Sequence, residues 1–444
     1  MSNKPEPEVL GHPLFRSALP VIQKLTVHHY EAVFVGGCVR DALAGRDIAD
    51  IDIATAATPE QVLELFDHVA PTGLQHGTVT VIMGGKGYEV TTFRKESAYE
   101  AFRKPSSVEF ISDLNEDLRR RDFTVNAMAM SEDGKLIDPF GGQADLRRGL
   151  IRCVGDADAR LQEDALRMLR GLRFAADYGF GQEGIEPSTW AAILRHGSLL
   201  RHIAMERVGV ELHKMIKGPH PDWAVQLLLE SRLLENTKEK LPLTAGNIPV
   251  AWMGPSQGEQ PSEVLLEPID SASCRWAALC ISFGLNPETS RSLFQALRYS
   301  RQQSDEIVSI IALHRRTVNL VVSQSHLEGD LLAENWTRIT LEMGKEASQF
   351  WLEMIEQAPW LLEGDETRSL VVLLRRLWSE LPVRELQQLA VNGGDILSDV
   401  RVKGGPWLKN LLFELLLDVA LGRLPNEKKA LLQQVRRKLE KEQS

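Results

Sequence analysis

The spacing of apolar residues changes once along this chain of 444 residues, near residue 147, and that change constrains the fold most strongly. Residues 30–142 carry the strand signals, which are short apolar and β-branched runs separated by glycine turns. From about residue 147 onward, apolar residues recur at three- and four-residue spacing, which is typical of amphipathic helices. A chain of this length exceeds what one hydrophobic core normally supports. We therefore predict an α+β fold, with a head built on a small mixed sheet and helices and an all-helical remainder.

Composition narrows the class of protein. Apolar residues make up 43% and charged residues 25% of the chain, as in soluble globular proteins. No apolar run is long enough for a membrane span, and the polar, proline-broken start does not resemble a signal peptide. The four cysteines lack both metal-ligand spacing and the pattern of a secreted disulfide framework, so we expect a cytoplasmic protein without a membrane partner. The net charge of -10 argues against charge-driven coating of nucleic acid, but segment 401–444 has ten Lys/Arg against five Asp/Glu and offers a local basic path.

The segment VFVGGCVRDALAGRDIADIDIAT, residues 33–55, places a glycine turn close to two aspartates. A short strand ends at Gly36 and Gly37, where the missing side chains permit a tight turn and exposed backbone N–H groups. Asp50 and Asp52 alternate with isoleucines, so both carboxylates share one strand face and repel each other unless a cation lies between them. Two surface aspartates on a solvated edge strand would show the same alternation. The adjacent glycine turn favours a divalent cation and the layout of a metal-dependent nucleotidyl transferase.

The next strands along the chain offer one further carboxylate. Residues 78–83 and 88–93 flank the sequence GGKG and predict a β-hairpin. Glu89 lies within its second strand and is a candidate third metal ligand, although an ordinary exposed strand glutamate would fit the pattern equally well. A further strand is predicted near 108–111, and a strand or buried helix over 125–130.

Three consecutive arginines and an aspartate precede an apolar run in LRRRDFTVNA, residues 118–127. Such a cluster is compatible with a solvated helix end. Beside a triphosphate, Arg120 and Arg121 would supply fork-shaped donors to phosphate or ribose oxygens, with Asp122 fixing one of them. We treat Arg120, Asp122 and Asn126 as supporting residues of such a site.

In EDALRMLRGLRF, residues 163–174, polar residues recur at every third position, namely Asp164, Arg167, Arg170 and Arg173. On a helix this spacing forms a winding polar band, and a salt-bridged surface helix would produce it too. A sharper hypothesis concerns Asp164 and Arg167, which are neighbours at i and i+3. An aspartate accepts from an exocyclic amine and an arginine donates to a bare ring nitrogen, and cytosine and adenine share that edge. The pair therefore predicts a reader that accepts C and A and rejects G and U.

With these motifs in order, the chain resembles the class II tRNA nucleotidyltransferases, the family of bacterial CCA-adding enzymes. The resemblance rests on GGCVRD, DID, RRDFTVNA, DPFGG and EDALRMLRGLRF, in family order and close to family spacing. It extends to the later stretches IAMERVGVELHKMIKG, LAVNGGDIL and GGPWLK. It implies a catalytic head, a neck with the base-reading helix, a body and a tRNA-binding tail, for which we predict the boundaries 1–148, 149–235, 236–370 and 371–444.

The resemblance also implies an activity. Such an enzyme adds CMP, CMP and AMP from CTP and ATP to the 3′ end of tRNA, releases pyrophosphate and needs no nucleic-acid template. Asp50 and Asp52 become the catalytic ligands of Mg²⁺, and Asp164 and Arg167 become the base-reading pair. The other implied residues of the nucleotide site are Gly36, Gly37, Arg40, Arg121, Arg170 and Arg173. We expect the body and tail to hold the acceptor and T arms of tRNA, in a monomer or a homodimer.

The family also contains CC-adding enzymes, A-adding enzymes and poly(A) polymerases. CC-adding members lack a flexible loop between the metal strand and the RRD motif, and residues 93–110 fill that place here. Relatives commonly have an acidic residue two positions before the loop arginine, whereas this chain has Ala101 before Arg103. An A-adding enzyme that acts only on tRNA ending in CC would keep both the loop and the base-reading pair, so this alternative stays open.

Two further alternatives make distinct predictions. A poly(A) polymerase is expected to carry a long, strongly basic C-terminal extension, whereas this sequence ends in RRKLEKEQS. A non-catalytic RNA-binding protein on the same fold is expected to have lost Asp50, Asp52 or the glycine turn, and all are present here.

Overall fold

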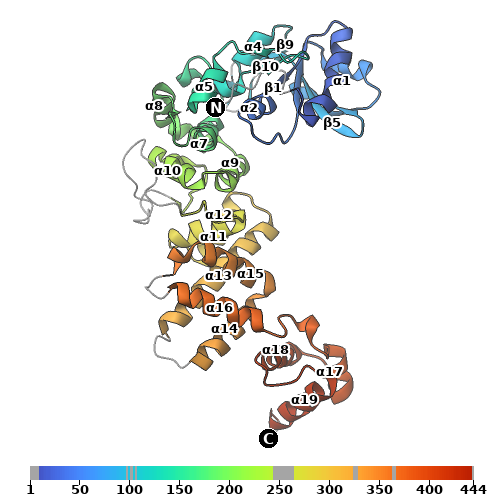
Figure 1. The fold of residues 1–444 in the computed structure, drawn as a ribbon, viewed down its shortest axis with the longest axis vertical. Coiled ribbons are helices and arrows are strands. Elements are labelled where there is room, and N and C mark those ends of the chain that lie inside the picture. The colour runs from blue at the N-terminus through green and yellow to red at the C-terminus, as the bar shows by residue number, and fades with distance from the viewer. Residues whose placement is uncertain are drawn as a thin grey trace. The chain divides into compact units, whose positions relative to one another are not determined.

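The computed structural model describes most of the chain, namely residues 10–96, 99–100, 104–105, 108–243, 265–323, 329–362 and 367–442. Its contacts divide the chain into two compact units, Met1–Glu263 and Val264–Ser444 (Figure 1). Within the described ranges, the strands all belong to the first unit and the second unit is helical, which confirms the predicted α+β class. In those same ranges, no helix combines the length and the apolar character needed to cross a membrane.

A seven-stranded mixed sheet forms the centre of the first unit, in the order β11-β10-β1-β2-β5-β4-β3. Its strands are β1 (Ala32–Val35), β2 (Asp52–Thr55), β3 (Val69–Gly73), β4 (Thr78–Met83), β5 (Lys86–Thr92), β10 (Ala129–Met130) and β11 (Leu136–Ile137). Among these strands β2 and β5 pair in parallel, and the other neighbours are antiparallel. The parallel pairing places Asp52, the first residue of β2, opposite Glu89 of β5.

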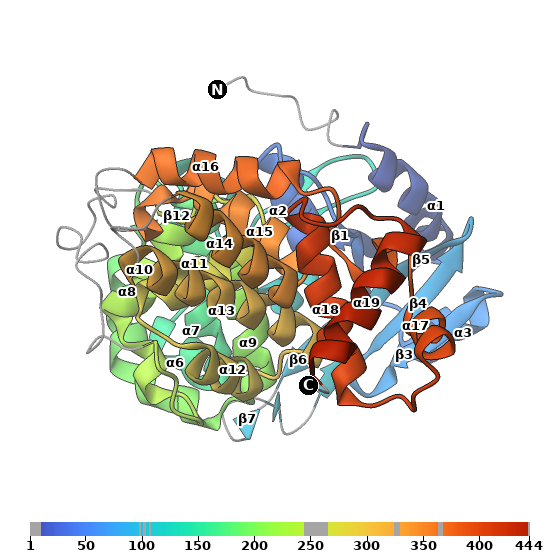
Figure 2. The same ribbon diagram turned by 90° about the horizontal axis from the view of Figure 1, so that it is seen from below.

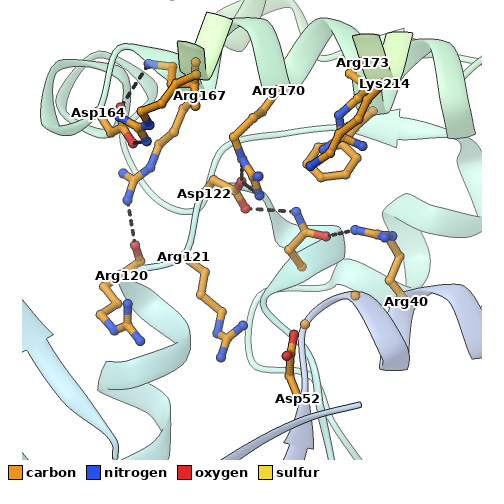
Figure 3. Close-up of a pocket in the computed structure, with 16 residues that line it drawn as sticks. Arg40, Asp52, Arg120, Arg121, Asp122, Asp164, Arg167, Arg170, Arg173 and Lys214 are labelled. Atoms are coloured by element: carbon orange, nitrogen blue, oxygen red, sulfur yellow. Dashed lines mark hydrogen bonds and ion pairs between the residues drawn. The ribbon is translucent and has the colours of Figure 1, made fainter. Parts of the chain in front are cut away.

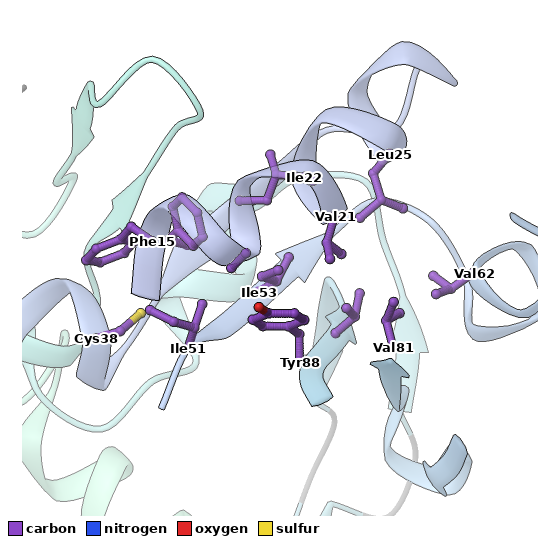
Figure 4. Packing of buried hydrophobic residues seen from close by; sticks show 14 of the residues in the cluster. Phe15, Val21, Ile22, Leu25, Cys38, Ile51, Ile53, Val62, Val81 and Tyr88 are labelled. Carbon is purple, nitrogen blue, oxygen red and sulfur yellow. The ribbon is translucent and has the colours of Figure 1, made fainter. Parts of the chain in front are cut away.

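Helix α1 (Pro13–Val27) covers one face of this sheet and closes a hydrophobic core (Figure 4). Phe15 on α1 meets Phe34 of β1 edge-on, with ring centroids 4.7 Å apart. Ile51 and Ile53 are both buried in the same cluster, so the predicted alternation of aspartate with isoleucine is confirmed. Their burial turns the carboxylate between them away from this core.

The opposite face of the sheet packs on a second, smaller cluster that includes α4 (Leu114–Arg119). Its buried members are Val33, Val35, Ala54, Phe93, Leu114, Leu118 and Ala129. Because α4 is anchored by two leucines and ends at Arg119, its packing fixes where the next two arginines of the chain emerge.

The predicted hairpin is present, with a tighter turn than expected. Strands β4 and β5 are connected by Gly84 and Gly85 alone, and Met83 still pairs with Lys86. The two glycines have φ values of +59° and +75°, the left-handed conformation that a two-residue hairpin turn requires. Strand β5 therefore begins at Lys86, two residues before the predicted start.

Residues 93–110 contain two short antiparallel pairs. These are β6 (Arg94–Glu96) with β9 (Val108–Phe110), and β7 (Tyr99–Glu100) with β8 (Lys104–Pro105). The first pair confirms the strand predicted near residue 108. Ala101, Arg103 and the linker predicted at 254–263 lie outside the described residues. The apolar run over 125–130 contains the end of a 3-10 turn, η3 (Thr124–Asn126), followed by β10.

Helices make up most of the rest of the first unit. They are α2 (Gly37–Leu43), α3 (Pro59–Leu65), α5 (Gly142–Arg148), α6 (Ala157–Glu163), α7 (Leu166–Tyr178), α8 (Pro187–His196), α9 (Met205–Lys217) and α10 (Pro221–Ser231). One departure from the predicted all-helical region is a two-stranded parallel sheet of β12 (Leu150–Ile151) and β13 (Gly184–Ile185). Strands of two residues are too short to show an alternating pattern in the sequence.

The second unit is a stack of helices. They are α11 (Ala272–Ser282), α12 (Pro287–Ala296), α13 (Arg301–Ser323), α14 (Gly329–Met343), α15 (Lys345–Gln357), α16 (Thr367–Glu380), α17 (Gly393–Val400), α18 (Pro406–Ala420) and α19 (Lys428–Glu442). Trp336 and Trp351 pack at 5.2 Å between ring centroids, in its interior. A separate cluster of leucines joins α18 and α19, which lie side by side near the C-terminus (Figures 1 and 2).

Candidate active site

The glycine turn lies against two of the predicted site residues. Gly36 follows β1 with a φ of +72°, which L-residues with side chains rarely adopt. A β-carbon at this position would lie 3.0 Å from Arg121 Nη1 and 3.7 Å from Asp52 Oδ2. Glycine is therefore required at this position both by its backbone conformation and by the close approach of two functional side chains.

A pocket of about 520 Å³ opens beside this turn (Figure 3). It is lined by all the predicted site residues except Asp50 and Glu89, namely Gly36, Gly37, Arg40, Asp52, Arg120, Arg121, Asp122, Asn126, Asp164, Arg167, Arg170 and Arg173. Four further residues complete the lining: Leu166, Phe174, Arg207 and Lys214. Segments more than 100 residues apart in the sequence thus meet at one cavity. Its lining holds eight Lys/Arg against three Asp, which favours a polyanionic ligand.

Asp52 lies at the lower edge of this pocket in Figure 3, and Glu89 is its pairing partner on the neighbouring strand β5. Burial, together with the negative charges of Asp50 and Glu89, raises the pKa of Asp52 to about 6, against a smaller opposing effect of Arg121. Asp50 precedes β2 and is exposed. In the part of the chain that the structure describes, no three His, Cys, Asp or Glu side chains are grouped closely enough to hold a metal ion. The role of Glu89 as a third ligand stays a prediction.

The two arginines that follow α4 are both held by a carboxylate that the sequence analysis did not single out. Asp117, which is buried, accepts from Arg120 Nη2 at 2.8 Å and from Arg121 Nη2 at 3.3 Å. Burial alone would raise the pKa of Asp117, but the two guanidinium groups hold it below its usual value. The prediction that Asp122 fixes one of these two arginines is wrong, because Asp117, one helical turn earlier, faces them instead.

Asp122 has a different set of partners. Its carboxylate accepts from Arg170 Nε at 2.8 Å and from Asn126 Nδ2 at 2.9 Å. Burial opposes its ionisation, yet Arg170, the amide of Asn126 and Arg167 hold the pKa of Asp122 far below its usual value. Asp122 therefore remains an anion that orients Arg170 toward the pocket.

Asp164 does not lie on the same helix as the three arginines. Helix α6 ends at Glu163 and α7 begins at Leu166, and between them Asp164 has an extended backbone (φ -140°, ψ 105°). Its carboxylate accepts from the backbone N–H of Leu166 at 3.1 Å, so Asp164 forms a turn just before Ala165, the N-cap of α7, and is not part of the helix. The single winding polar band predicted for Asp164 to Arg173 is therefore wrong at its first member.

Asp164 and Arg167, the predicted base-reading pair, are each held by hydrogen bonds to other residues. Arg207 of α9 donates through Nη2 to Asp164 Oδ2 at 2.7 Å. Arg167 donates to the backbone carbonyls of Arg160 and Arg120 at 2.9 and 3.1 Å. In Figure 3, Asp164 and Arg167 lie on the opposite side of the pocket from Asp52. Each of the two side chains is thus held in place by protein groups behind it.

Helix α9 contributes residues that site prediction missed. Arg207, Glu211 and Lys214 lie on one face of it, at spacings of four and three residues. Glu211 is buried and accepts from Arg173 Nε at 2.8 Å. All three lie within the sequence stretch IAMERVGVELHKMIKG. The shared helix face was the available signal, but periodicity alone does not reveal which neighbouring helix that face meets.

The aromatic ring of Phe174 contacts three of the arginines that line the pocket. Phe174, on α7, has the guanidinium carbons of Arg173, Arg40 and Arg170 at 4.0, 4.9 and 5.3 Å from its ring centroid. Cation–π attraction of this kind holds guanidinium groups without consuming their N–H donors. These donors stay available to a ligand or to neighbouring carboxylates.

Comparisons with known proteins cover nearly the whole chain. Residues 32–152 match the family model "Poly A polymerase head domain", residues 184–241 match "Probable RNA and SrmB- binding site of polymerase A", and residues 268–435 match "tRNA nucleotidyltransferase domain 2 putative". The chain is 38% identical over 418 residues to the CCA-adding enzyme of Bacillus cytotoxicus, covering 94% of this chain and 97% of the relative. It is also 38% identical over 422 residues to that of Geobacillus stearothermophilus, covering 94% and 95% of the two chains.

Solved structures agree. A crystal structure of the Bacillus stearothermophilus CCA-adding enzyme in complex with CTP matches with a TM-score of 0.76 and 34% identity, over 97% of this chain and 99% of that one. A Thermotoga maritima CCA-adding enzyme complexed with tRNA, at 19% identity and a TM-score of 0.62 over 97% and 98% of the two chains, shares the fold. The chain therefore belongs to the family of tRNA nucleotidyltransferases known as CCA-adding enzymes.

Proposed function

We propose that this protein adds CMP, CMP and AMP in turn to the 3′ end of tRNA, using CTP and ATP and releasing pyrophosphate. The observation that carries the proposal is the convergence of three sets of residues on one pocket: the glycine turn with Asp52, the arginines of the RRD segment and α7, and the Asp164/Arg167 pair. The reaction requires activation of the nucleophile, phosphate binding and choice of the base, and each set of residues meets one of these requirements.

The phosphate end of the pocket would lie between the glycine turn and the arginines. Gly36 and Gly37 carry no side chains of their own, so the Arg121 guanidinium can lie directly against Gly36. Arg40 and Arg173 face the same region from α2 and α7 (Figure 3). Guanidinium groups suit this role because they present planar, paired donors to phosphate oxygens.

The carboxylates at this end fit a divalent cation. The pKa of Asp52 is raised to about 6 by burial and by two neighbouring acidic groups, so a cation there would relieve an unfavourable accumulation of negative charge. Oxygen donors are those that Mg²⁺ prefers, and we infer that Asp50 and Asp52 hold it. When bound, Mg²⁺ would increase the nucleophilicity of the tRNA 3′-hydroxyl and stabilise charge on the departing pyrophosphate.

The base end would be read by Asp164 and Arg167. The Asp164 carboxylate accepts from the exocyclic amine of C or A, and Arg167 donates to the adjacent ring nitrogen. Each carboxylate oxygen accepts more than one hydrogen bond, so Arg207 keeps Asp164 oriented while it reads the base. Guanine and uracil present a carbonyl and an N–H at this edge, which oppose like groups of the pair.

The remaining parts of the proposal concern the rest of the chain. We retain 1–148 as the head, 149–235 as the neck, 236–370 as the body and 371–444 as the tRNA-binding tail. The basic C-terminal segment supports phosphate contacts with the acceptor and T arms of tRNA. Four buried cysteines, all free, fit a reducing cytoplasm.

The test uses pure protein, Mg²⁺, CTP and ATP, of which one is labelled in each reaction, and two tRNAs. One tRNA lacks CCA and the other ends in CC. Successive addition of C, C and A to the first tRNA is the expected result. Addition of A to the second tRNA alone would instead identify an A-adding enzyme. A reaction with chelator, and the variant Asp52→Asn, are the negative controls, and product formation in either would refute the metal assignment.

A further inference from the structure

Arg40 is held by groups from three different elements. Its own helix, α2, supplies Asp41, whose two carboxylate oxygens accept from Arg40 Nε at 3.0 Å and Nη2 at 3.1 Å. Asn126 of η3 accepts from Nη1. Helix α7 supplies aromatic rings, with Phe174 and Tyr178 centred 4.9 and 4.8 Å from the guanidinium carbon.

Tyr178 also binds the carboxylate that holds Arg40. Its hydroxyl donates to Asp41 Oδ1, the oxygen that also accepts from Arg40 Nε. Burial raises the pKa of Tyr178 to about 12, so the hydroxyl remains a donor at any working pH. Asp41 belongs to the sequence motif GGCVRD, yet it neither lines the pocket nor takes part in the reaction as proposed above.

These contacts close a ring. From Tyr178 the hydrogen bonds run through Asp41 to Arg40, then through the Asn126 side chain to Asp122. Asp122 binds Arg170, which lies on the same helix as Tyr178, two turns earlier. Figure 3 shows the part of this ring from Arg40 to Arg170. A closed ring restrains its members more tightly than separate pairs, because one group cannot move without straining the others.

We propose that Asp41 and Tyr178 are positioning residues for the nucleotide triphosphate. They act through Arg40 and hold its guanidinium at a fixed place relative to α7, the helix whose first turn carries Arg167 of the base-reading pair. This inference rests on the proposed function, in which Arg40 contacts the phosphates or sugar. It extends that function by assigning the spacing between the two ends of the nucleotide to a side-chain network that begins at Asp41.

The network sits at one end of the pocket, and this location determines what its loss would do. Among the described residues, the side-chain hydrogen bonds of Asp41 and Tyr178 join them to each other and to Arg40, and do not involve Asp164, Arg167 or Arg207 at the base end. Weakening the network should therefore reduce affinity for CTP and ATP by the same factor. The preference for C and A over G and U should stay as it is.

The experiment compares Tyr178→Phe with the matched control Tyr88→Phe, in the full-length protein. Tyr88 is buried in the core of the head, and its hydroxyl donates to the Ser17 carbonyl at 2.9 Å, so both variants lose one hydroxyl and keep the ring. Calorimetric titration with CTP and with ATP gives Kd without tRNA, and thermal unfolding gives Tm. Tyr178→Phe should weaken both nucleotides about three- to tenfold, and Asp41→Ala about ten- to a hundredfold, because hydrogen bonds to charged groups are the stronger ones.

Equal weakening of CTP and ATP by Tyr178→Phe, with no such change in Tyr88→Phe, supports the proposal. A Tm loss matching that of Tyr88→Phe without a change in Kd would overturn it, since the contact would then only stabilise the fold. A change confined to one nucleotide would also overturn it. If the wild type binds CTP without adding it to tRNA, the proposed function fails while the binding data still decide the role of Tyr178.

Discussion

Replacing Asp117 with asparagine tests how the nucleotide site is supported from behind. The Asp117 side chain is only 1% exposed, and its oxygens accept from Arg120 Nε and Nη2, from Arg121 Nη2 and from the backbone N–H of Arg94. An asparagine fills the same volume, but in either orientation its NH₂ group faces a donor. Loss of the charge-assisted bonds, together with one donor opposed to a donor, should cost about 2–3 kcal/mol in the free energy of unfolding.

The effect should also reach the nucleotide. Arg121 Nη1 lies near Gly36 because Asp117 holds the other guanidinium nitrogen, so the variant should raise the KM for CTP and ATP about tenfold. Urea unfolding measures the first effect and steady-state incorporation the second. The matched control is Asp113→Asn on the same helix. Asp113 caps the helix by accepting from backbone N–H groups, a role that asparagine fills equally well, so its cost should stay within a few tenths of a kcal/mol.

The stability difference between wild type and Asp117→Asn should depend on pH. The pKa of Asp117 is lower in the folded than in the unfolded protein, because its guanidinium neighbours outweigh the effect of burial. Its stabilising contribution is therefore complete above the unfolded pKa and is lost as pH falls through the folded pKa. The stability gap between wild type and Asp117→Asn should be full at about pH 7 and narrow below about pH 4. A variant as stable as Asp113→Asn at neutral pH, with an unchanged KM, would refute the supporting role of Asp117.

Three further outcomes follow from the site. Gly45→Ala, at a φ of +67°, should cost about 1–2 kcal/mol. Gly36→Ala should cost more, because Gly36 combines a φ of +72° with a ψ of -130°, outside the left-handed helical region. Only the β-carbon at residue 36 meets other residues, so activity should fall in Gly36→Ala alone, and equal activity of the two variants would exclude a steric role for Gly36. Asp164→Ala should raise misincorporation of G and U relative to C and A about tenfold or more while changing the KM of CTP less, as measured by single-nucleotide incorporation; unchanged fidelity would dismiss Asp164 as a reader. The pKa of Asp52 is raised from 3.8 to about 6, so its ionisation lowers the stability of the folded protein above about pH 6 and has no such effect below the unfolded pKa. Bound Mg²⁺ would relieve this loss of stability, so added Mg²⁺ should raise Tm more at about pH 7.5 than at about pH 5. An equal Mg²⁺ effect at both pH values would place the cation elsewhere.

Local sequence patterns predicted local structure well. Ile51 and Ile53 are buried as their alternation requires, and the glycines of the hairpin occupy the left-handed turn positions. These features depend on residues that are close in sequence, where spacing fixes geometry. The residue types of the pocket were predictable for the same reason, because glycine turns, paired aspartates and arginine clusters each imply a ligand class.

Long-range partners were not predictable. The sequence assigned Asp122 to an arginine beside it, whereas it binds Arg170 from α7, which packs against it in three dimensions. Asp164 was predicted to lie on a continuous helix because an aspartate just before a helix and one within it have the same spacing to the next arginine. Asp117 and Glu211 were not predicted as site residues, because an acidic residue within a helix is ordinarily solvated. Only the three-dimensional packing shows that these two are buried.

Each arginine that lines the pocket pairs with a carboxylate, and only Arg120 and Arg121 share one: Arg40 pairs with Asp41, Arg120 and Arg121 with Asp117, Arg167 with Glu163, Arg170 with Asp122, Arg173 with Glu211, and Arg207 with Asp164. These ion pairs offset the mutual repulsion of the arginines within the protein and hold the guanidinium groups in place. Several of these pairs are largely shielded from solvent, and salt screens them less than it screens a diffusing triphosphate. Raising the ionic strength should therefore slow the binding of CTP and ATP at salt concentrations that leave the ion pairs of the pocket intact. Because the enzyme binds a new nucleotide before each addition, a preorganised pocket presents the same arrangement of side chains to every nucleotide.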